Sequence, residues 1–206
     1  MTEALLDYFR ATSALELVAV ALAIVYLLLA IRASPWCWPA ALASSALYVY
    51  LFGGARLYMD AVLNLFFAAM AIYGWNRWRH GGPDHGSLPI TRASRRVHVA
   101  ALGTIGLLTV ISGSLLGRYT NQAWPYIDSF IAWASVVTTW LAARKLLENW
   151  PYWIAIDALA IPVYMNRHLR VTAVLFALYV VLAVVGWLHW QRAYHAQMDR
   201  PAASIA

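Results

Sequence analysis

The sequence predicts an all-α integral membrane protein with seven transmembrane helices, and three observations lead to that fold class. Of the 206 residues, 63% are hydrophobic and only 12% are charged. The mean hydropathy is +0.61, whereas a soluble domain of this size needs more charge to cover its surface. Seven apolar segments also follow one another with short connections. One crossing needs roughly 20 apolar residues, so seven crossings take about 140 and leave a single membrane domain over the chain.

The apolar segments set the expected helices in order. We expect them at about 13–31, 37–52, 59–78, 97–116, 126–143, 150–164 and 171–190. The connections are short except for a polar segment at 76–96, which is rich in Gly, Pro and Arg. That composition predicts a linker between two parts of one membrane domain, which spans 1–206.

Basic residues are distributed unequally between the two expected sides of the membrane. One side carries ten: Arg32, Arg77, Arg79, Arg92, Arg95, Arg96, Arg144, Lys145, Arg192 and Arg200. The other carries five: Arg10, Arg56, Arg118, Arg167 and Arg170. The richer side is expected to be cytoplasmic, which places the N-terminus outside and the C-terminus inside. The net charge of +6 is thereby assigned to membrane-flanking loops, and no nucleic-acid partner is expected.

The second half of the sequence resembles the first half when the two are aligned with one constant shift in residue number. This shift, which we call the repeat offset, aligns Trp38 with Trp150. At this repeat offset Pro39 also falls on Pro151, and the pattern Gly-Trp-x-x-Trp recurs in the third and seventh segments. Shared Leu, Ala and Val would arise by chance between apolar sequences, but these matches would not. We interpret the repeat offset as the sign of an internal repeat.

The repeat predicts a 3+1+3 arrangement. Two three-helix repeats, at 13–78 and 126–190, are joined by a linking helix at 97–116. Both repeats begin on the same side, so they are parallel, as in SWEET-type carriers. In such folds a substrate site lies between the repeats near the membrane midplane.

The sixth segment offers the most specific candidate site. Trp150 and Trp153 are three residues apart and Asp157 follows four later, so all three share one helix face. Asn149 adds an amide that can donate and accept hydrogen bonds. This set suits a flat, positively charged aromatic ligand, through stacking, cation–π attraction and a carboxylate. The alternative for the tryptophans is an aromatic belt at the membrane surface.

Other candidate binding residues lie elsewhere in the chain. Glu16 and Asp128 are acids in apolar segments and are related by the repeat offset, with helix packing as the alternative role. Asn64, Tyr73 and Trp75 of the third segment complete the set of candidates.

The sequence lacks the motifs of several other functions. There is no Walker sequence, no metal-spaced histidine pair within a segment and no nucleophile elbow. The only lysine, Lys145, lies at a helix end, which argues against a retinal protein, and the single Cys37 allows no internal disulfide. We therefore expect no catalytic residues, no metal and no cofactor, and a protein that is not an enzyme.

Two patterns resemble the Pnu family of bacterial vitamin transporters. Tyr-Gly-Trp-x-x-Trp closes the third segment at 73–78, and Arg-Lys-x-x-Glu-Asn-Trp-x-x-Trp opens the sixth at 144–153. The acid in Tyr-Ile-Asp-Ser at 126–129 belongs to the same resemblance. The resemblance implies a 3+1+3 fold in the bacterial inner membrane and facilitated uptake of an unphosphorylated vitamin such as nicotinamide riboside. A cytoplasmic vitamin kinase would then trap the substrate, and Asn149, Trp150 and Trp153 would contribute to the central site.

The resemblance leaves the ligand open. Nicotinamide riboside carriers tend to have Asn where this chain has Asp157, and the family also contains thiamine and riboflavin carriers. A membrane enzyme or sensor that binds without transport is a second class of function, and a sugar carrier is a third. Coupling to H⁺ or Na⁺ and a homo-oligomer also stay open.

Overall fold

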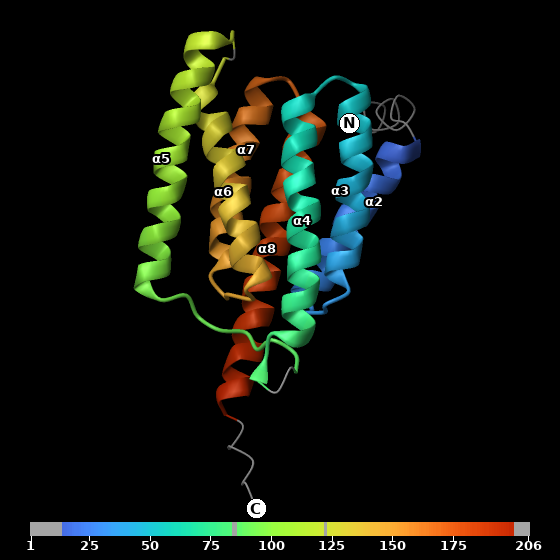
Figure 1. Ribbon diagram of the computed structural model, residues 1–206, viewed down its shortest axis with the longest axis vertical. Coiled ribbons are helices and arrows are strands. Elements are labelled where there is room, and N and C mark those ends of the chain that lie inside the picture. The colour runs from blue at the N-terminus through green and yellow to red at the C-terminus, as the bar shows by residue number, and fades with distance from the viewer. Residues whose placement is uncertain (1–13, 84–85, 122, 200–206) are drawn as a thin grey trace, which may run out of the picture.

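The computed structural model describes residues 14–83, 86–121 and 123–199. Within these residues the chain forms seven helices that run alternately up and down a bundle (Figure 1). They are α2 (Ala14–Ile31), α3 (Cys37–Gly54), α4 (Tyr58–His80), α5 (Arg95–Tyr119), α6 (Pro125–Ala143), α7 (Asn149–Asn166) and α8 (Arg170–Met198). Each coincides with one predicted segment. The last helix continues to Met198 rather than ending at Trp190, and its polar end extends beyond the bundle.

Five of the helices described are long and apolar enough to cross a membrane on their own. These are α2, α4, α5, α6 and α8. The other two, α3 and α7, contain buried polar side chains, including Ser44 and Ser45 on α3 and Asn149 and Asp157 on α7. Polar groups in an apolar helix usually face a cavity or a partner. These two helices are therefore the ones to examine for a site.

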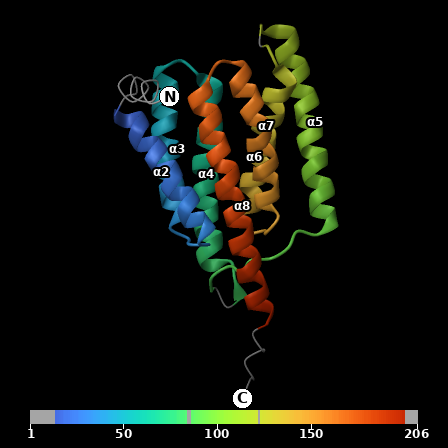
Figure 2. The ribbon, with the colours of Figure 1, turned by 180° about the vertical axis from the view of Figure 1, so that it is seen from behind.

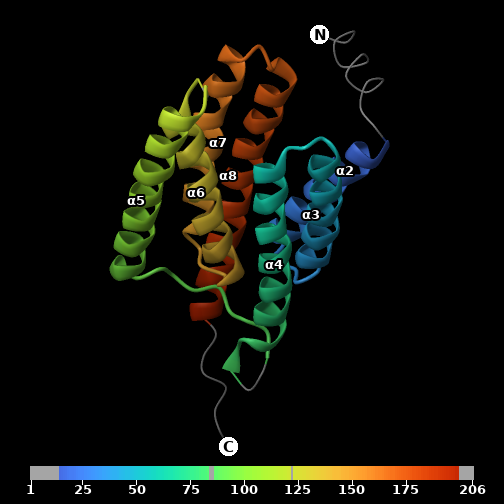
Figure 3. The same cartoon turned by 45° about the horizontal axis from the view of Figure 1, so that its top comes forward.

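The helices are arranged as two groups and one peripheral helix. Helices α2, α3 and α4 pack consecutively, as do α6, α7 and α8, and the groups meet where α4 contacts α6 and α8 contacts α2. Helix α5 lies at the edge of the bundle against α6, and the linker crosses one end of the molecule to reach it (Figures 1 and 2). Seen from a tilted view, α5 and α6 stand beside α8 on one side, with α4, α3 and α2 on the other (Figure 3).

Two tryptophans that are related by the repeat offset pack against two glycines that are related in the same way. The ring of Trp38 on α3 lies where a Cβ at Gly74 of α4 would be, and the ring of Trp150 on α7 does the same at Gly186 of α8. Any other residue at either glycine would collide with the indole. The glycines therefore permit close contact between neighbouring helices.

Two further tryptophans connect the groups by hydrogen bonds. Trp78 Nε1 donates to the Ala142 carbonyl oxygen at 3.1 Å. Trp190 Nε1 donates to the Ala30 carbonyl oxygen at 2.9 Å. The two donors are related by the repeat offset, as are the two acceptors, and all four residues are buried. Each acceptor lies at the end of a helix and also accepts a backbone hydrogen bond from the following turn, from Ala33 N to Ala30 at 2.9 Å and from Lys145 N to Ala142 at 2.8 Å.

The turns follow the same relationship. Ala33 and Lys145 have φ of 51° and 56°, and Arg56 and His168 both have φ of 60°. These left-handed conformations cost side-chain-bearing residues roughly 1–2 kcal/mol each. Ala33 and Lys145 occupy equivalent turns in the two groups, as do Arg56 and His168. Each turn of the first group therefore has the same backbone geometry as its counterpart in the second.

The linker is attached to the turn between α6 and α7. Lys145 Nζ donates to the Leu88 carbonyl oxygen at 2.8 Å, and Thr91 N donates to the Lys145 carbonyl oxygen at 3.2 Å. Glu148 accepts from Arg92 Nε at 3.1 Å. Burial lowers the pKa of the Lys145 ammonium, and the ring of Trp78 lies 4.8 Å from its nitrogen. The linker is thus held directly beside the start of α7.

Candidate functional site

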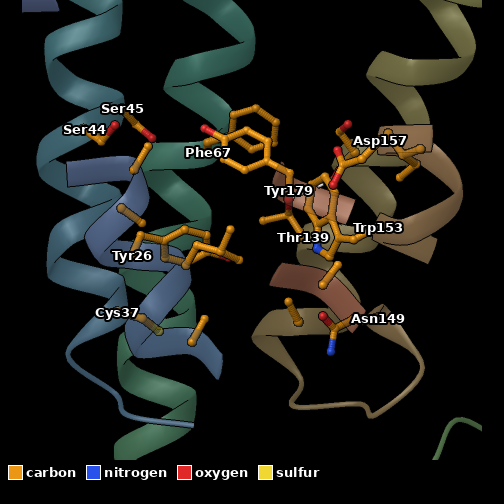
Figure 4. A pocket seen from close by; sticks show the side chains of 18 of the residues that line it. Tyr26, Cys37, Ser44, Ser45, Phe67, Thr139, Asn149, Trp153, Asp157 and Tyr179 are labelled. Atoms are coloured by element: carbon orange, nitrogen blue, oxygen red, sulfur yellow. Dashed lines mark hydrogen bonds between the residues drawn. The ribbon is translucent and has the colours of Figure 1, made fainter. Parts of the chain in front are cut away.

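A cavity of about 360 Å³ lies between the two groups of helices. This volume falls within the range of roughly 300–1,000 Å³ that is typical of small-molecule sites. Its lining side chains come from α2, α3, α4, α6, α7 and α8, and none comes from α5. Side chains from opposite groups face each other across it (Figure 4). The cavity is lined mainly by apolar and aromatic groups, with a few polar ones.

Four tryptophans close the end of the cavity that lies nearest the linker. Ring centroids lie 5.4 Å apart for Trp38 and Trp78, 5.7 Å for Trp78 and Trp190, and 5.5 Å for Trp190 and Trp150. Each of the four is at most 2% exposed. The first and third of these pairs are edge-to-face, and such pairs add about 0.5–1.5 kcal/mol beyond area burial. This tryptophan cluster forms a rigid floor.

Two indole nitrogens of this cluster remain as hydrogen-bond donors. Trp38 Nε1 and Trp150 Nε1 are buried and have no hydrogen-bond partner in the described part of the chain. Both residues line the cavity. An unpartnered buried donor is costly, so a ligand acceptor at either position would gain binding energy.

Five predicted residues line the cavity. Asn149 is 2% exposed, and its side-chain amide donates to the Leu146 carbonyl oxygen at 2.6 Å. Trp150 is fixed in the floor, while Trp153 lies higher on α7, directly below Asp157 (Figure 4). Asn64 reaches the cavity from α4. The predicted shared face of α7 is thus present, and that face points into the cavity.

Asp157 is the cavity's distinguishing group. It is 6% exposed, and among the described residues that line the cavity it is the only acid, with no Lys, Arg or His beside it. No salt bridge or hydrogen bond to its carboxylate forms within the residues that the structure describes. A buried carboxylate without a counter-charge favours a cationic ligand, because the ligand supplies the missing charge.

Two predicted acids lie away from the cavity. Asp128, in the first turn of α6, accepts two hydrogen bonds from Arg167 Nη2 at 2.9 and 2.7 Å. Glu16 lies in the first turn of α2 and does not line the cavity. The Asp128–Arg167 pair joins the start of α6 to the turn after α7, which is a packing role. The structure does not bring either acid to Asp157.

Two predicted aromatic residues of α4 also lie elsewhere. Tyr73 is 40% exposed on the outside of the bundle. The ring of Trp75 packs 5.3 Å from that of Trp36 and 4.8 Å from the Arg79 guanidinium. Neither lines the cavity. In the pattern Tyr-Gly-Trp-x-x-Trp, it is Trp78 that reaches the cavity floor.

Sequence reasoning missed most of the lining that comes from helices other than α7. Besides Trp38, Trp78 and Trp190 of the floor, the missed polar and aromatic lining residues are Tyr26, Ser44, Ser45, Tyr48, Phe67, Ser135, Thr139, Phe176 and Tyr179. The repeat offset could have found three lining residues of α3, because Cys37, Ala41 and Ser45 correspond to Asn149, Trp153 and Asp157. At these three positions the cavity therefore has small residues on α3, where α7 has an amide, an indole and a carboxylate.

An apolar helical bundle that encloses such a cavity is the architecture of a multi-pass membrane transport protein. The chain belongs to the nicotinamide mononucleotide transporter family, whose profile matches residues 13–192. This confirms the resemblance seen in the sequence patterns.

Its relatives are transporters rather than enzymes. The chain is 26% identical to the riboflavin/roseoflavin transporter RibM of Streptomyces davaonensis, over 85% of this chain and 83% of that protein. It is 24% identical to the nicotinamide riboside transporter PnuC of Escherichia coli, over 70% of this chain and 71% of that protein. The crystal structure of the vitamin B3 transporter PnuC has the same fold, with a TM-score of 0.72, 19% identity and coverage of 95% and 88%.

Proposed function

We propose that this protein carries nicotinamide riboside across the membrane by facilitated diffusion. The observation behind this proposal is the uncompensated carboxylate of Asp157 beside the Trp153 ring in the cavity. Nicotinamide riboside has a flat pyridinium ring with a permanent positive charge. The indole supplies stacking and cation–π attraction, which is worth about 2 kcal/mol or more when desolvated. The carboxylate supplies the counter-charge.

The polar side chains around the cavity suit the rest of this substrate. Asn149 offers an amide beside the floor, and Ser45 lies on the opposite wall at the level of Asp157 (Figure 4). A ribose presents several hydroxyls and a carboxamide presents both a donor and an acceptor, so each can pair with such groups. Pairing of buried polar groups provides specificity, since an analogue that lacks the matching group leaves them unsatisfied.

Two other vitamins are the alternatives within this family. Thiamine is also a flat cation and meets the same charge requirement. Riboflavin is carried by the relative RibM, but its three-ring system is neutral and larger. The charge of Asp157 favours a cation over riboflavin, and the modest cavity of about 360 Å³ favours a substrate with one aromatic ring over a three-ring system.

The transport mechanism that we propose rests on a 3+1+3 arrangement. In it, α2–α4 and α6–α8 are parallel repeats, α5 links them, and α3 and α7 also cross the membrane. The contacts that recur at the repeat offset support this, as does the cavity between the groups. Rocking of one repeat against the other would expose the cavity to each side in turn.

The proposed orientation follows from charge. The end of the bundle with the linker carries most of the arginines and would face the cytoplasm, with the N-terminus outside. The tryptophan floor would then separate the cavity from the cytoplasm. A vitamin kinase on that side would hold the product inside, because a phosphorylated substrate brings negative charge toward Asp157.

Binding to the purified protein tests the ligand. Calorimetric titrations with nicotinamide riboside, thiamine and riboflavin should show the highest affinity for nicotinamide riboside. Asp157→Asn should weaken it by about tenfold to a hundredfold, since a charge-assisted contact contributes about 1.5–3 kcal/mol. Asp128→Asn is the matched control and should leave affinity unchanged. Absence of nicotinamide riboside binding, or equal effects of the two variants, would refute the proposal.

A further inference from the structure

A second concave surface lies on the outside of the bundle. It is a groove of about 500 Å³ between α4 and α5, and α6 forms its base. Its lining is apolar apart from Thr104 and Arg96, and includes Phe66 of α4 and Val137 and Trp140 of α6. Figure 1 shows α6 set between and behind α4 and α5. We call this surface the α4–α5 groove.

The groove faces the bilayer rather than the cavity. No residue that lines it also lines the cavity. Its α5 edge belongs to a helix with many exposed apolar side chains, such as Val99, Leu102 and Leu107, which are 58–66% exposed. A membrane-facing apolar groove is filled by whatever surrounds it, and a single acyl chain has the required chemistry.

One end of the groove is positively charged. Arg96, in the first turn of α5, lines it, and no ion pair to this arginine forms among the described residues. The Arg144 guanidinium lies 4.9 Å from the ring centroid of Trp140, another lining residue at the same end. From Arg96 to Thr104 the groove follows α5 for roughly 12 Å at 1.5 Å per residue.

We infer that the α4–α5 groove binds an anionic phospholipid, with its phosphate on Arg96 and one acyl chain along α5. A basic pocket between helices at the arginine-rich end of a membrane protein is the typical setting for an acidic headgroup. The indole of Trp140 lies at that end, where aromatic residues meet the headgroup level. Because α4 and α5 come from different parts of the bundle, the bound lipid bridges them.

A lipid fits the charge of the groove better than a second copy of the chain does. The described residues that line it include an arginine and no acid, so an occupant with negative charge is favoured. The chain has a net charge of +6, and the end where Arg96 lies also carries Arg95 and Arg144. A second copy meeting it in the same membrane orientation would present the same arginine-rich end, and like charges would repel.

Native mass spectrometry of the purified protein tests this inference without any vitamin ligand. The protein is incubated with equal amounts of dioleoyl phosphatidylglycerol and dioleoyl phosphatidylcholine. We expect the protein to retain one phosphatidylglycerol molecule and to prefer it over phosphatidylcholine by roughly fivefold. This is the preference expected from one arginine near an anionic headgroup. Arg96→Gln should abolish the preference. Arg170→Gln, at the opposite end of the bundle, should keep it.

A second pair of variants tests the groove itself. Ala100 lines the groove on α5, whereas the exposed Leu102 on the same helix does not. Ala100→Phe should displace the retained lipid of either kind, and Leu102→Phe should not. Equal retention of the two lipids by the unmodified protein, or loss of preference in Arg170→Gln as well, would overturn the inference. So would loss of a dimer rather than of a lipid in Ala100→Phe, because a second copy would then occupy the groove.

Discussion

Trp190 on α8 donates its indole N–H to the carbonyl oxygen of Ala30 on α2, across 2.9 Å and between the two helical groups. The bond from Trp78 to Ala142 is its counterpart at the repeat offset. Both lie at the floor of the cavity, where the groups are held together. A movement that separates the two groups at the floor of the cavity would have to break both hydrogen bonds.

Loss of one of these bonds should destabilise the protein. Trp190→Phe keeps an aromatic ring but removes the hydrogen bond to the Ala30 carbonyl oxygen. That oxygen still accepts from Ala33 N at 2.9 Å, so the expected cost is that of one hydrogen bond, about 1 kcal/mol. Trp38→Phe is the matched control, because Trp38 is equally buried but its Nε1 has no partner in the described part of the chain. Thermal unfolding in detergent should give a lower midpoint for Trp190→Phe than for Trp38→Phe. Equal midpoints would mean that the hydrogen bond contributes nothing.

The glycine contacts provide a second stability test. Gly186→Ala places a methyl group into the ring of Trp150, and overpacking of this kind costs about 1–3 kcal/mol. Gly103→Ala on α5 meets nothing within 4 Å and should be neutral or slightly stabilising, since Ala favours helix. Unfolding midpoints of the two variants provide the comparison. A normal midpoint for Gly186→Ala would show that Trp150 can move aside.

The ring of Trp153 should carry much of the binding energy. Trp153→Ala removes the stacking surface next to Asp157 and should weaken nicotinamide riboside binding about thirtyfold, which corresponds to about 2 kcal/mol. Trp75→Ala removes an indole outside the cavity and should not change affinity. Calorimetry on folded samples of both variants measures this. If Trp75→Ala has the larger effect, the substrate binds elsewhere.

The attachment of the linker should depend on Glu148. Its carboxylate accepts from the Ala93 backbone N–H at 2.7 Å as well as from Arg92, so Glu148→Ala should speed hydrogen exchange at the Ala93 amide. Arg92→Gln removes the ion pair but keeps the bond to Ala93, and exchange there should change little. Exchange mass spectrometry of the linker peptide distinguishes the two. Unchanged exchange in Glu148→Ala would show that backbone contacts alone hold the linker.

Hydropathy was sufficient to predict the seven helices, because lipid-exposed residues keep each segment apolar along its length. Two of the seven, α3 and α7, are not apolar enough to be recognised as spans on their own, and both contain polar residues that line the cavity. The end of α8 was also placed too early, since its polar extension beyond Trp190 has no hydropathy signal.

The lining of the candidate site was predictable only where its residues are close together in the sequence. Asn149, Trp153 and Asp157 belong to one helix, so the helical period places them together. Ser45 and Tyr179 reach the same cavity from other helices, as isolated residues without a local pattern. The prediction for Asp128 assumed that an acid in an apolar segment faces a site. The structure instead pairs it with Arg167, at a helix start where negative charge is favoured anyway.

Counterflow in proteoliposomes tests the proposed transport most directly. Vesicles loaded with unlabelled nicotinamide riboside are diluted into trace labelled nicotinamide riboside. We predict a transient accumulation of label that is absent from protein-free vesicles and strongly reduced by Asp157→Asn, while Asp128→Asn retains it. Saturable binding without accumulation of label would contradict a carrier and indicate a membrane protein that binds its ligand without moving it.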